Sequence, residues 1–496
     1  MNALQSQLQS LSPDHIVLQG SGDNLRAADL LTQVGLLAEM LRSRSAQTVA
    51  LFADNSPEWV IVDLACQWES ITLVPIPTFF SEGQIQHLLA TASVDTLLYD
   101  AQLKDQVARW SQGMCFDIPS ANGLCAVTIP KDVDSCRPPS THKITFTSGS
   151  TGQPKGVCLS SAQCVQVAQS LAELIEIDHP RHLCLLPLST LLENIAGVYL
   201  PLMLGGLCIA PPLTTVGMLG SSGVHVASLL DSLECYQPDT VILVPQLLAV
   251  FDQAISNGWQ PPASLKFVAV GGGHVPEALL HRVREAGMPV YEGYGLSESG
   301  SVVSLNTPKA DRPGSCGQVL SHARVIERGG ELLVSGNTFL GYLNDKSSWG
   351  QEQFSTGDLG RIDSEGFVSV TGRCKNVLVS SFGRNISPEW LESELQATGY
   401  ISQAVVVGDG RPFCTALLWE GGGKQSNAAL QQLVANVNQT LPDYAQIKDW
   451  RRLPEPLDTN SGMLTENGRY RRSVISKHYS ATIETMYSEF KEMEIR

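Results

Sequence analysis

A stretch rich in glycine and hydroxyl residues carries the strongest chemical signal in the chain. Residues 144–157 read ITFTSGSTGQPKGV, in which an apolar run leads into three hydroxyl residues, three glycines and Lys155. Glycine lets backbone N–H groups approach a ligand, hydroxyls donate hydrogen bonds and lysine supplies a positive charge, so this segment predicts a loop for a polyphosphate. Pro154 before the lysine separates it from the Walker pattern. The alternative interpretation is an ordinary Ser/Gly-rich hairpin loop.

The segments around this loop predict the sheets that position it. Short apolar runs alternate with helical stretches such as residues 57–70 and 81–93, the second with Ser81 as its N-cap. The strand-type runs are residues 48–54, 71–77, 94–100, 240–245, 265–273 and 289–295. This alternation favours parallel strands covered by helices on both faces. We therefore expect an α/β multidomain protein whose large N-terminal region holds two sheets of parallel type, with residues 110–143 as a connector.

The pattern changes in the last third of the chain. From about residue 312, short alternating segments bounded by glycine predict hairpins and a β-barrel-like unit. After Gly372, the segments SPEWLESELQATG, AVVVGD and CTALLWE predict a small α+β domain. We expect a domain boundary at this point, with residues 1–372 as one unit and residues 373–496 as a smaller one.

Composition and charge narrow the classes of function. The chain has 496 residues, 43% of them hydrophobic, and a net charge of −16. This composition excludes fibrous and wholly disordered proteins, and the charge disfavours wrapping by nucleic acid or binding to an anionic membrane. A local phosphate site remains compatible with an acidic protein.

The cysteines and the apolar segments indicate a cytoplasmic protein. Twelve cysteines are scattered without a Cys-x-x-Cys pair, which favours reduced thiols over a disulfide framework, and we find no signal peptide. Residues 195–213 carry no charge, but prolines and glycines interrupt them. We expect a buried helix, a Gly–Gly turn and a short strand there, and no transmembrane segment.

The loop at 147–156, TSGSTGQPKG, resembles the phosphate-loop signature of the adenylate-forming superfamily, which includes acyl-CoA synthetases, luciferases and peptide-synthetase adenylation domains. Further segments match the superfamily in its order and together span nearly the whole chain. They are NSPEWV (55–60), LVPIPTFFSEGQI (73–85), LPLSTLLENIAGVYLPLMLGG (186–206), VPQLL (244–248), GGGHVP (271–276), YEGYGLSES (291–299), GELLVSGNTFLGYLN (330–344), STGDLG (355–360), GRCKNVLVSSFGRNISPEWLESEL (372–395) and MLTENGRYRR (463–472). So many motifs in one order make the resemblance specific.

The resemblance implies an AMP-forming acyl-CoA synthetase. A carboxylate is a poor electrophile because its leaving group would be an oxide. Such enzymes convert it with ATP and Mg²⁺ into acyl-AMP, release pyrophosphate and let the thiol of CoA attack. Similarity of NISPEWLE and LPLSTLLEN to the fatty-acyl branch favours a medium- or long-chain fatty acid. Two alternatives stay open, an acyl-adenylate ligase that loads a separate acyl carrier protein and a non-catalytic nucleotide-binding homologue.

The resemblance also assigns roles to residues. Lys155, Glu298 and Arg469 would be catalytic, with Glu298 as the magnesium ligand. Residues assigned to the nucleotide are Thr147, Ser148, Gly149, Ser150, Thr151, Gly152, Gly271, Gly272, Gly273, Tyr294, Gly295, Ser297, Asp358 and Arg373. Lys375 would be the hinge of the small domain, and Gly383 and Arg384 would bind CoA.

Other interpretations compete with some of these assignments. Asp358 and Arg373 could form a plain surface ion pair, and the apolar run at 190–206 could be ordinary core. Two positions depart from the superfamily. Thr190 and Leu191 stand where many long-chain members carry a His followed by a bulky residue, and Arg469 stands where the superfamily has a lysine.

Overall fold

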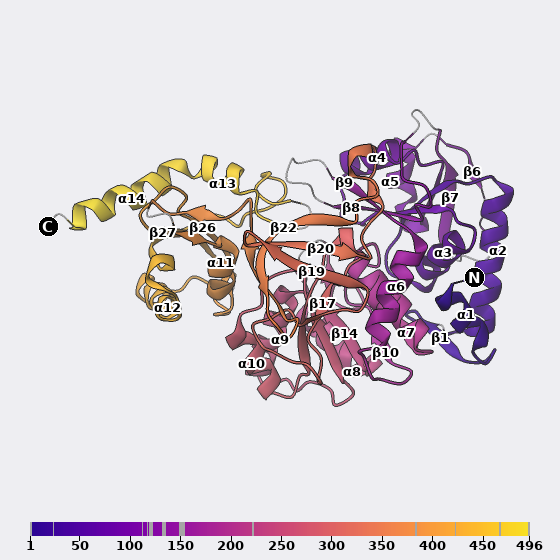
Figure 1. The fold of residues 1–496 in the computed structure, drawn as a ribbon, viewed down its shortest axis with the longest axis horizontal. Helices are drawn as coiled ribbons and strands as arrows, with labels where there is room; N and C mark the ends of the chain where they lie inside the picture. Colours follow the sequence, from indigo (N-terminus) through magenta and orange to yellow (C-terminus); the bar gives the residue numbers. More distant parts are fainter. Residues whose placement is uncertain are drawn as a thin grey trace.

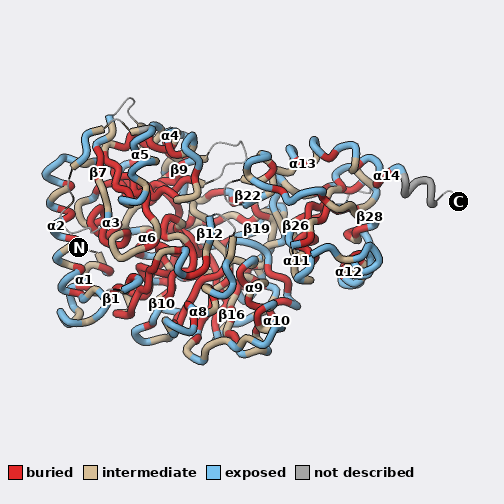
Figure 2. The backbone as a smooth tube through the Cα atoms, turned by 180° about the vertical axis from the view of Figure 1, so that it is seen from behind, coloured by how far each residue is buried: buried red, intermediate tan, exposed pale blue. Residues whose placement is uncertain are grey.

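The computed structural model describes residues 2–22, 24–111, 113–116, 118, 123–130, 135–147, 154–220, 223–381, 384–421, 423–465 and 468–494. A large body holds most of the chain, and a smaller unit containing α11 to α14 lies at the opposite end from α1 and α2 (Figure 1). The buried backbone is concentrated in the sheets of the large body and in the strands of the smaller unit (Figure 2). Among the described residues, no helix has the length and apolar character needed to cross a bilayer.

An eight-stranded sheet carries the strand that leads into the Ser/Gly-rich loop. Its order is β21-β9-β8-β4-β3-β5-β7-β6, with parallel pairing at its centre and antiparallel pairing toward both edges. Its strands are β3 (Thr48–Phe52), β4 (Thr72–Pro75), β5 (Thr96–Asp100), β6 (Cys115–Phe116), β7 (Leu124–Thr128), β8 (Lys143–Thr147), β9 (Lys155–Leu159) and β21 (Gly341–Tyr342). We did not expect β6 and β7, which lie inside the segment predicted as a connector.

A nine-stranded sheet forms the second layer of strands. Its order is β18-β17-β16-β15-β14-β10-β11-β1-β2, and the run from β16 to β1 is parallel. Its strands are β1 (Ile16–Gln19), β2 (Asn24–Arg26), β10 (Arg181–Leu183), β11 (Leu207–Ile209), β14 (Thr240–Leu243), β15 (Phe267–Val270), β16 (Val290–Tyr294), β17 (Ser304–Leu305) and β18 (Gln318–Val319). The predicted pair of sheets of parallel type is confirmed.

Helices cover these two sheets, and their ends follow local sequence signals. They are α1 (Ala3–Ser10), α2 (Ala27–Ser43), α3 (Pro57–Trp68), α4 (Glu82–Thr91), α5 (Lys104–Trp110), α6 (Ser161–Ala172), α7 (Leu200–Met203), α8 (Val226–Tyr236), α9 (Pro245–Ser256) and α10 (Glu277–Glu285). Ser81 caps α4 with Gln84 in a capping box, as predicted. Helix α3 is buried from Trp59 to Gln67, which explains its mostly apolar sequence, and its buried polar residues Asp63 and Gln67 have partners.

The uncharged segment at 195–213 has the predicted elements, with one surprise. A π-helical segment, η2 (Glu193–Tyr199), precedes α7, Gly205 and Gly206 make the turn, and β11 follows. Gly205 has φ +66°, a left-handed conformation that favours glycine. π-helical turns are rare and concentrate at functional sites.

The C-terminal third consists of antiparallel strands followed by the smaller unit. The region predicted as barrel-like is a four-stranded antiparallel sheet of order β19-β20-β22-β23, formed by β19 (Ala323–Arg328), β20 (Glu331–Gly336), β22 (Gln353–Ile362) and β23 (Val368–Arg373). The smaller unit follows, with β24 (Leu378–Val379), β25 (Asn385–Ile386), α11 (Pro388–Gln396), β26 (Ile401–Val407), β27 (Cys414–Glu420), α12 (Asn427–Thr440), β28 (Ile447–Arg452), α13 (Arg472–His478) and α14 (Ser480–Glu494). Its helix–strand mix agrees with the predicted α+β character.

Candidate active site

The Ser/Gly-rich segment joins two paired strands at one edge of the eight-stranded sheet. β8 ends at Thr147 and β9 begins at Lys155, and these two residues are partners in the antiparallel ladder. Ser148, Gly149, Ser150, Thr151 and Gly152 lie outside the described residues. The exposed Lys155 places its Nζ atom 5.2 Å from the centroid of the Tyr342 ring, a cation–π arrangement.

Glu298 and Tyr342 form a hydrogen-bonded pair beside Lys155. The Tyr342 hydroxyl donates to Glu298 Oε1 over 2.8 Å, and the backbone N–H of Phe339 donates to the Glu298 carbonyl over 2.7 Å. Burial, and then the neighbouring Glu298 charge, raise the pKa of the Tyr342 phenol above its ordinary value. Lys155, Tyr342 and Glu298 therefore form one contiguous polar group, with Ser297 next to Glu298 in a short 3₁₀ turn.

Tyr294, Asp358 and Arg373 form a second group. The Tyr294 hydroxyl donates to Asp358 Oδ2 over 2.7 Å, and Arg373 Nε lies 2.7 Å from Asp358 Oδ1. Asp358 and Arg373 are cross-strand partners in β22 and β23, so the ladder fixes the pair. Burial raises the pKa of the Asp358 carboxyl, while Arg373, Tyr294 and Arg469 oppose that change. The Asp358 side chain is 4% exposed and that of Arg373 is 46% exposed, so the pair faces solvent on one side only.

The predicted glycines lie where β15 and β16 end. β15 stops at Val270, directly before Gly271, and Gly272 has φ +84°. A Cβ atom on Gly271 would lie 3.2 Å from the Gly293 carbonyl oxygen, and one on Gly295 would lie 1.5 Å from the Ser301 carbonyl oxygen. A side chain at Gly295 therefore cannot be accommodated without moving the backbone. Gly273 completes the run, at the carboxyl ends of parallel strands where ligands of open α/β sheets bind.

Arg469 belongs to the smaller unit and reaches the second group. A backbone pair between Thr465 and Arg469, with the Thr465 N–H donating to the Arg469 carbonyl over 2.8 Å, closes the turn that presents it. Arg469 is an exposed residue whose guanidinium is partly desolvated by neighbouring protein. This loss of hydration, followed by the charge of Arg373, lowers its pKa, whereas the carboxylates of Asp358 and Glu298 raise it. Five predicted charged or phenolic side chains from distant segments are thus close enough to influence one another's charge.

The predicted hinge lies in a tight turn between the two units. The N–H of Asn376 donates to the Arg373 carbonyl over 3.0 Å, which makes Lys375 the third residue of this turn. The N–H of Cys374 donates to the Gly357 carbonyl over 2.8 Å and holds the start of the turn against β22. Arg384 is exposed in the hairpin of β24 and β25, while Gly383 lies outside the described residues.

Sequence reasoning missed Tyr342 and left Thr190 and Leu191 without a role. Tyr342 lies inside the quoted GYLN segment, but an aromatic residue in a strand gives no signal that its hydroxyl will meet a carboxylate 44 residues away. The Thr190 hydroxyl donates to the Pro187 carbonyl over 2.6 Å, and Leu191 is buried. The Thr190 hydroxyl therefore already has a hydrogen-bond partner, and Leu191 is a buried apolar residue.

Comparisons with known proteins agree with this geometry. A family model described as AMP-binding enzyme matches residues 6–343, and one described as AMP-binding enzyme C-terminal domain matches residues 375–491. The chain is 25% identical to a long-chain-fatty-acid–CoA ligase from Mycobacterium bovis, over 96% of this chain and 95% of that protein. It is 26% identical to a 2-succinylbenzoate–CoA ligase from Staphylococcus aureus, over 92% of this chain and 97% of that protein.

Solved structures show the same fold. The o-succinylbenzoate–CoA synthetase from Bacillus subtilis, in complex with its acyl-adenylate intermediate, has a TM-score of 0.77 at 24% identity and covers 95% of this chain and 97% of its own. The motif order, the charged groups at the junction of the two units and the matches over both units all agree. The chain belongs to the family of AMP-binding enzymes and is an AMP-forming acid–thiol ligase of the adenylate-forming superfamily.

Proposed function

We propose that the protein activates a carboxylic acid with ATP to acyl-AMP, releases pyrophosphate and transfers the acyl group to the thiol of CoA. The observation that carries this proposal is the pairing of Asp358 with both Tyr294 and Arg373, next to Glu298 and Arg469. It combines, in one place, hydrogen-bonding groups for a ribose and an adenine with charges for a triphosphate. The CoA ligases among its relatives support the same reaction.

The residues divide the work of the first step. Lys155 and the Ser/Gly-rich loop would bind the triphosphate, and Arg469 would neutralise the charge that the carboxylate and the α-phosphate bring together. Gly271, Gly272 and Gly273 would let the adenine lie against backbone, with Tyr294 stacked on it and Gly295 and Ser297 beside it. Asp358 would accept hydrogen bonds from the ribose hydroxyls, and Arg373 would fix Asp358 in place.

Magnesium fits Glu298. A hard cation prefers carboxylate oxygens, and the Tyr342 hydroxyl uses only Oε1 of this carboxylate. The o-succinylbenzoate–CoA synthetase from Bacillus subtilis, which shares the fold, has also been solved in complex with ATP and magnesium ion. When bound, Mg²⁺ would neutralise phosphate charge, while Glu298 holds it and Tyr342 keeps Glu298 in position.

The second step would use a different arrangement of the two units. We propose a division into residues 1–372 and 373–496, with rotation at Lys375, which lies in the tight turn that joins them. Such a rotation would move Arg469 away from the site and bring Gly383 and Arg384 toward it, where Arg384 would meet a phosphate of CoA.

The acid is, in this proposal, a medium- or long-chain fatty acid. Two observations support it: the ligase from Mycobacterium bovis among the relatives, and the apolar side chains of Leu191, Ile195 and Val198 in the segment that the superfamily uses for its acyl pocket. A second candidate is an aromatic acid, because 2-succinylbenzoate–CoA ligases are also among the relatives.

ATP–pyrophosphate exchange with a panel of acids tests the first step and its substrate. We expect magnesium-dependent exchange with one class of acid, and AMP release coupled to loss of free CoA thiol. Exchange without CoA consumption, but with acylation of an added carrier protein, would favour the carrier-loading ligase. Absence of exchange with fatty, aromatic and small acids alike would overturn the proposal and favour a non-catalytic nucleotide-binding protein.

A further inference from the structure

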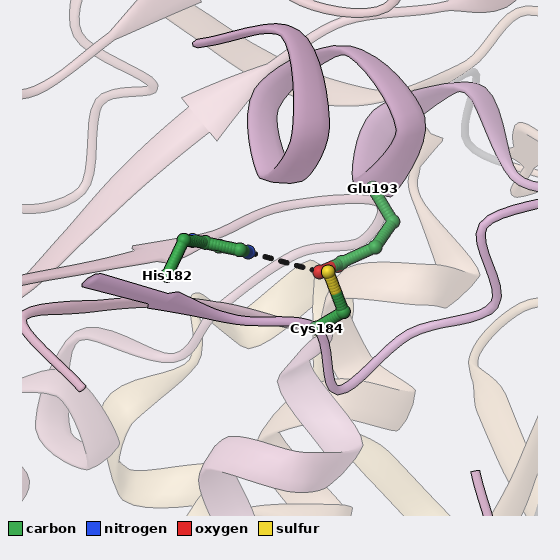
Figure 3. A group of neighbouring side chains, drawn as sticks. All are labelled: His182, Cys184 and Glu193. Atoms are coloured by element: carbon green, nitrogen blue, oxygen red, sulfur yellow. Dashed lines mark hydrogen bonds and ion pairs between the residues drawn. The ribbon is translucent and has the colours of Figure 1, made fainter. Parts of the chain in front are cut away.

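A cluster of three metal-binding residue types lies in the interior and shares no residue with the groups described above. His182 is on β10, Cys184 follows directly after that strand, and Glu193 begins the π-helical segment η2. Their side chains converge from the sheet and the helix (Figure 3). All three residues are buried, with exposures of 2%, 0% and 0%. None of them takes part in the proposed reaction.

The geometry of the cluster resembles a coordination site. One ligand atom from each residue lies within 4.8 Å of both others. His182 Nε2 and Glu193 Oε1 are 3.0 Å apart, and a tetrahedral zinc with nitrogen and oxygen ligands at about 2.1 Å separates such atoms by roughly 3.4 Å. For this pair of atoms, a shift of a few tenths of an ångström would give the separation found around zinc. Neighbouring strands and η2 fix the backbone positions of all three residues.

The histidine is oriented as metal ligands usually are. His182 Nδ1 lies 2.8 Å from the Thr240 hydroxyl, and His182 and Thr240 are partners in the ladder between β10 and β14. A hydrogen bond at Nδ1 fixes the ring and leaves Nε2 free to bind a metal. Metal-bound histidines usually make such a hydrogen bond with their other ring nitrogen.

Glu193 supplies an independent observation. Its Oε2 atom is buried and has no hydrogen-bond partner in the described structure, although a carboxylate in the interior requires partners for both oxygens. Gly197 leaves the space that the carboxylate and the imidazole use, since a Cβ atom there would lie 2.7 Å from both Glu193 Oε1 and His182 Nε2. His182 thus pairs with Oε1, and the Leu186 N–H and the Cys184 thiol lie beside the carboxylate, but no donor completes a hydrogen bond to Oε2.

We propose that His182 Nε2, Cys184 Sγ and the Glu193 carboxylate bind a structural Zn²⁺ ion. Binding would release the Cys184 thiol proton and the proton shared between His182 and Glu193. A thiolate, a carboxylate and a neutral imidazole balance the two positive charges of zinc, and a neutral complex is the one that a dry interior tolerates. Nitrogen, sulfur and oxygen ligands in one site favour zinc over magnesium or calcium.

Cys208 lies beside the cluster but does not belong to it, because its sulfur is not within 4.8 Å of all three ligand atoms. Its Sγ atom lies 3.7 Å from Cys184 Sγ. Cys208 is buried on β11, which pairs with β10. The ion would be held by β10, the residue that follows it and η2, and its role would be to stabilise this part of the fold.

Metal content tests the proposal directly. The untagged full chain, expressed with zinc in the medium and dialysed, should contain about one zinc per chain, and Cys184→Ser and His182→Gln should lose at least nine-tenths of it. Cys208→Ser should keep zinc, because this sulfur lies outside the three-residue cluster. Cys414→Ser is the matched control, because Cys414 is equally buried but lies in the smaller unit.

Cobalt gives a readout that does not depend on folding of the variants. The wild-type chain loaded with Co²⁺ should gain a thiolate-to-cobalt charge-transfer band, and chelation of the metal should lower its melting temperature. A wild-type chain without zinc and without this band would overturn the proposal and leave a hydrogen-bonded His–Glu pair in the core. Full zinc content in Cys184→Ser would overturn it as well. Neither outcome depends on whether ATP–pyrophosphate exchange occurs.

Discussion

Two arginine–carboxylate pairs of this protein differ in how completely they are satisfied. Inside the smaller unit, Arg472 donates to both oxygens of Glu392 over 2.7 and 2.6 Å, and the Val406 N–H donates to the same carboxylate. At the junction, Arg373 reaches Asp358 with one nitrogen, 2.7 Å from Oδ1. Arg472 is 19% exposed and Arg373 is 46% exposed.

The difference separates a structural pair from a binding pair. The two-pronged contact of Arg472 uses the donors that face Glu392, and both partners are enclosed by the domain. Arg373 keeps donors that face solvent, and the Asp358 carboxylate sits at the edge of the predicted nucleotide site. A carboxylate that is buried but incompletely paired is available to a ligand, and we expect the two pairs to respond differently to mutation.

Removing Arg472, the arginine inside the smaller unit, should have the largest effect on the free energy of unfolding. Arg472→Met leaves Glu392 buried without its counter-charge, which costs about 3–5 kcal/mol in the free energy of unfolding at pH 8. Arg373→Met should cost less than Arg472→Met, because Arg373 is 46% exposed and water can replace it beside the Asp358 carboxylate. Urea denaturation followed by tryptophan fluorescence measures both. Equal losses in the two variants would contradict the distinction between the pairs.

Loss of Glu298 should abolish most of the first chemical step. Glu298→Ala removes the proposed magnesium ligand and should lower magnesium-dependent pyrophosphate exchange by on the order of a hundredfold or more, as for a lost partner of transition-state charge. Circular dichroism should stay native. Lys155→Ala should be milder, because backbone N–H groups and hydroxyls of the loop share the phosphate charge.

The exposed Glu277 provides the matched control for Glu298. Its carboxylate lies on α10, 63% exposed, where it pairs with His281. Glu277→Ala should therefore leave exchange and magnesium dependence unchanged. Wild-type exchange rates in Glu298→Ala would show that this carboxylate does not hold the ion.

Glu392 should give the smaller unit a measurable pH dependence. Burial raises its pKa to about 7, against the opposing effects of Arg472 and the Val406 N–H. The folded chain therefore binds more protons than the unfolded chain between about pH 4.5 and 7, so this carboxyl contributes stability that is fully present below that window and lost as pH rises through it. Glu392→Gln should remove a slope of up to about 1.4 kcal/mol per pH unit.

Urea denaturation at several pH values between 5 and 8 measures this slope as the difference between wild type and variant. The wild-type slope alone is not sufficient, because burial also raises the pKa of Glu292 in the larger unit to about 7 and this carboxyl adds a pH dependence of its own. Glu292→Gln should remove that second contribution and leave the first. Parallel pH profiles for wild type and Glu392→Gln would contradict the assignment.

The sequence predicted those elements of the fold whose sequence signals lie within a few residues of one another. Periodicity and caps located strands such as β3 and helices such as α4, because burial on both faces and N-terminal capping each leave a mark within a few residues. β7 escaped notice because it is a short antiparallel strand, paired with β5 and β6, in a Pro-containing region with weak periodicity. The register that makes Asp358 face Arg373 includes a shift between Leu359 and Gly360 in the hairpin of β22 and β23, and the sequence pattern does not encode that shift.

The interior polar contacts were also beyond sequence reasoning. Lys143, in the apolar run before the Ser/Gly-rich loop, lies 2.9 Å from Asp63 on α3 and is 1% exposed. A lysine in a strand-type run looks like a solvent-facing residue, and only the packed fold reveals its partner. Resemblance to the superfamily predicted many of the site residues. It did not predict that Tyr342 would be the partner of Glu298, because that contact too depends on the packed fold.

Arg469→Lys should have the smallest effect and the most specific one. Lysine is the residue of the superfamily at this position, and its compact ammonium can turn toward both the carboxylate and the α-phosphate, whereas a guanidinium is planar and bulkier. We expect pyrophosphate exchange within a few-fold of the wild type, equal or faster. Arg469→Ala should lose exchange by about tenfold or more while it keeps thioester formation from a supplied acyl-adenylate.

The separation of the two steps makes Arg469 informative. Arg469 and Arg472 are three residues apart on one segment, yet Arg472 is held inside the smaller unit by Glu392 and Arg469 reaches across the junction toward Asp358 and Glu298. If Arg469 acts only in the first step, its loss leaves the stability and the second step intact, whereas loss of Arg472 harms both through unfolding. An Arg469→Ala variant with unimpaired exchange would instead make Arg469 part of a solvated basic face.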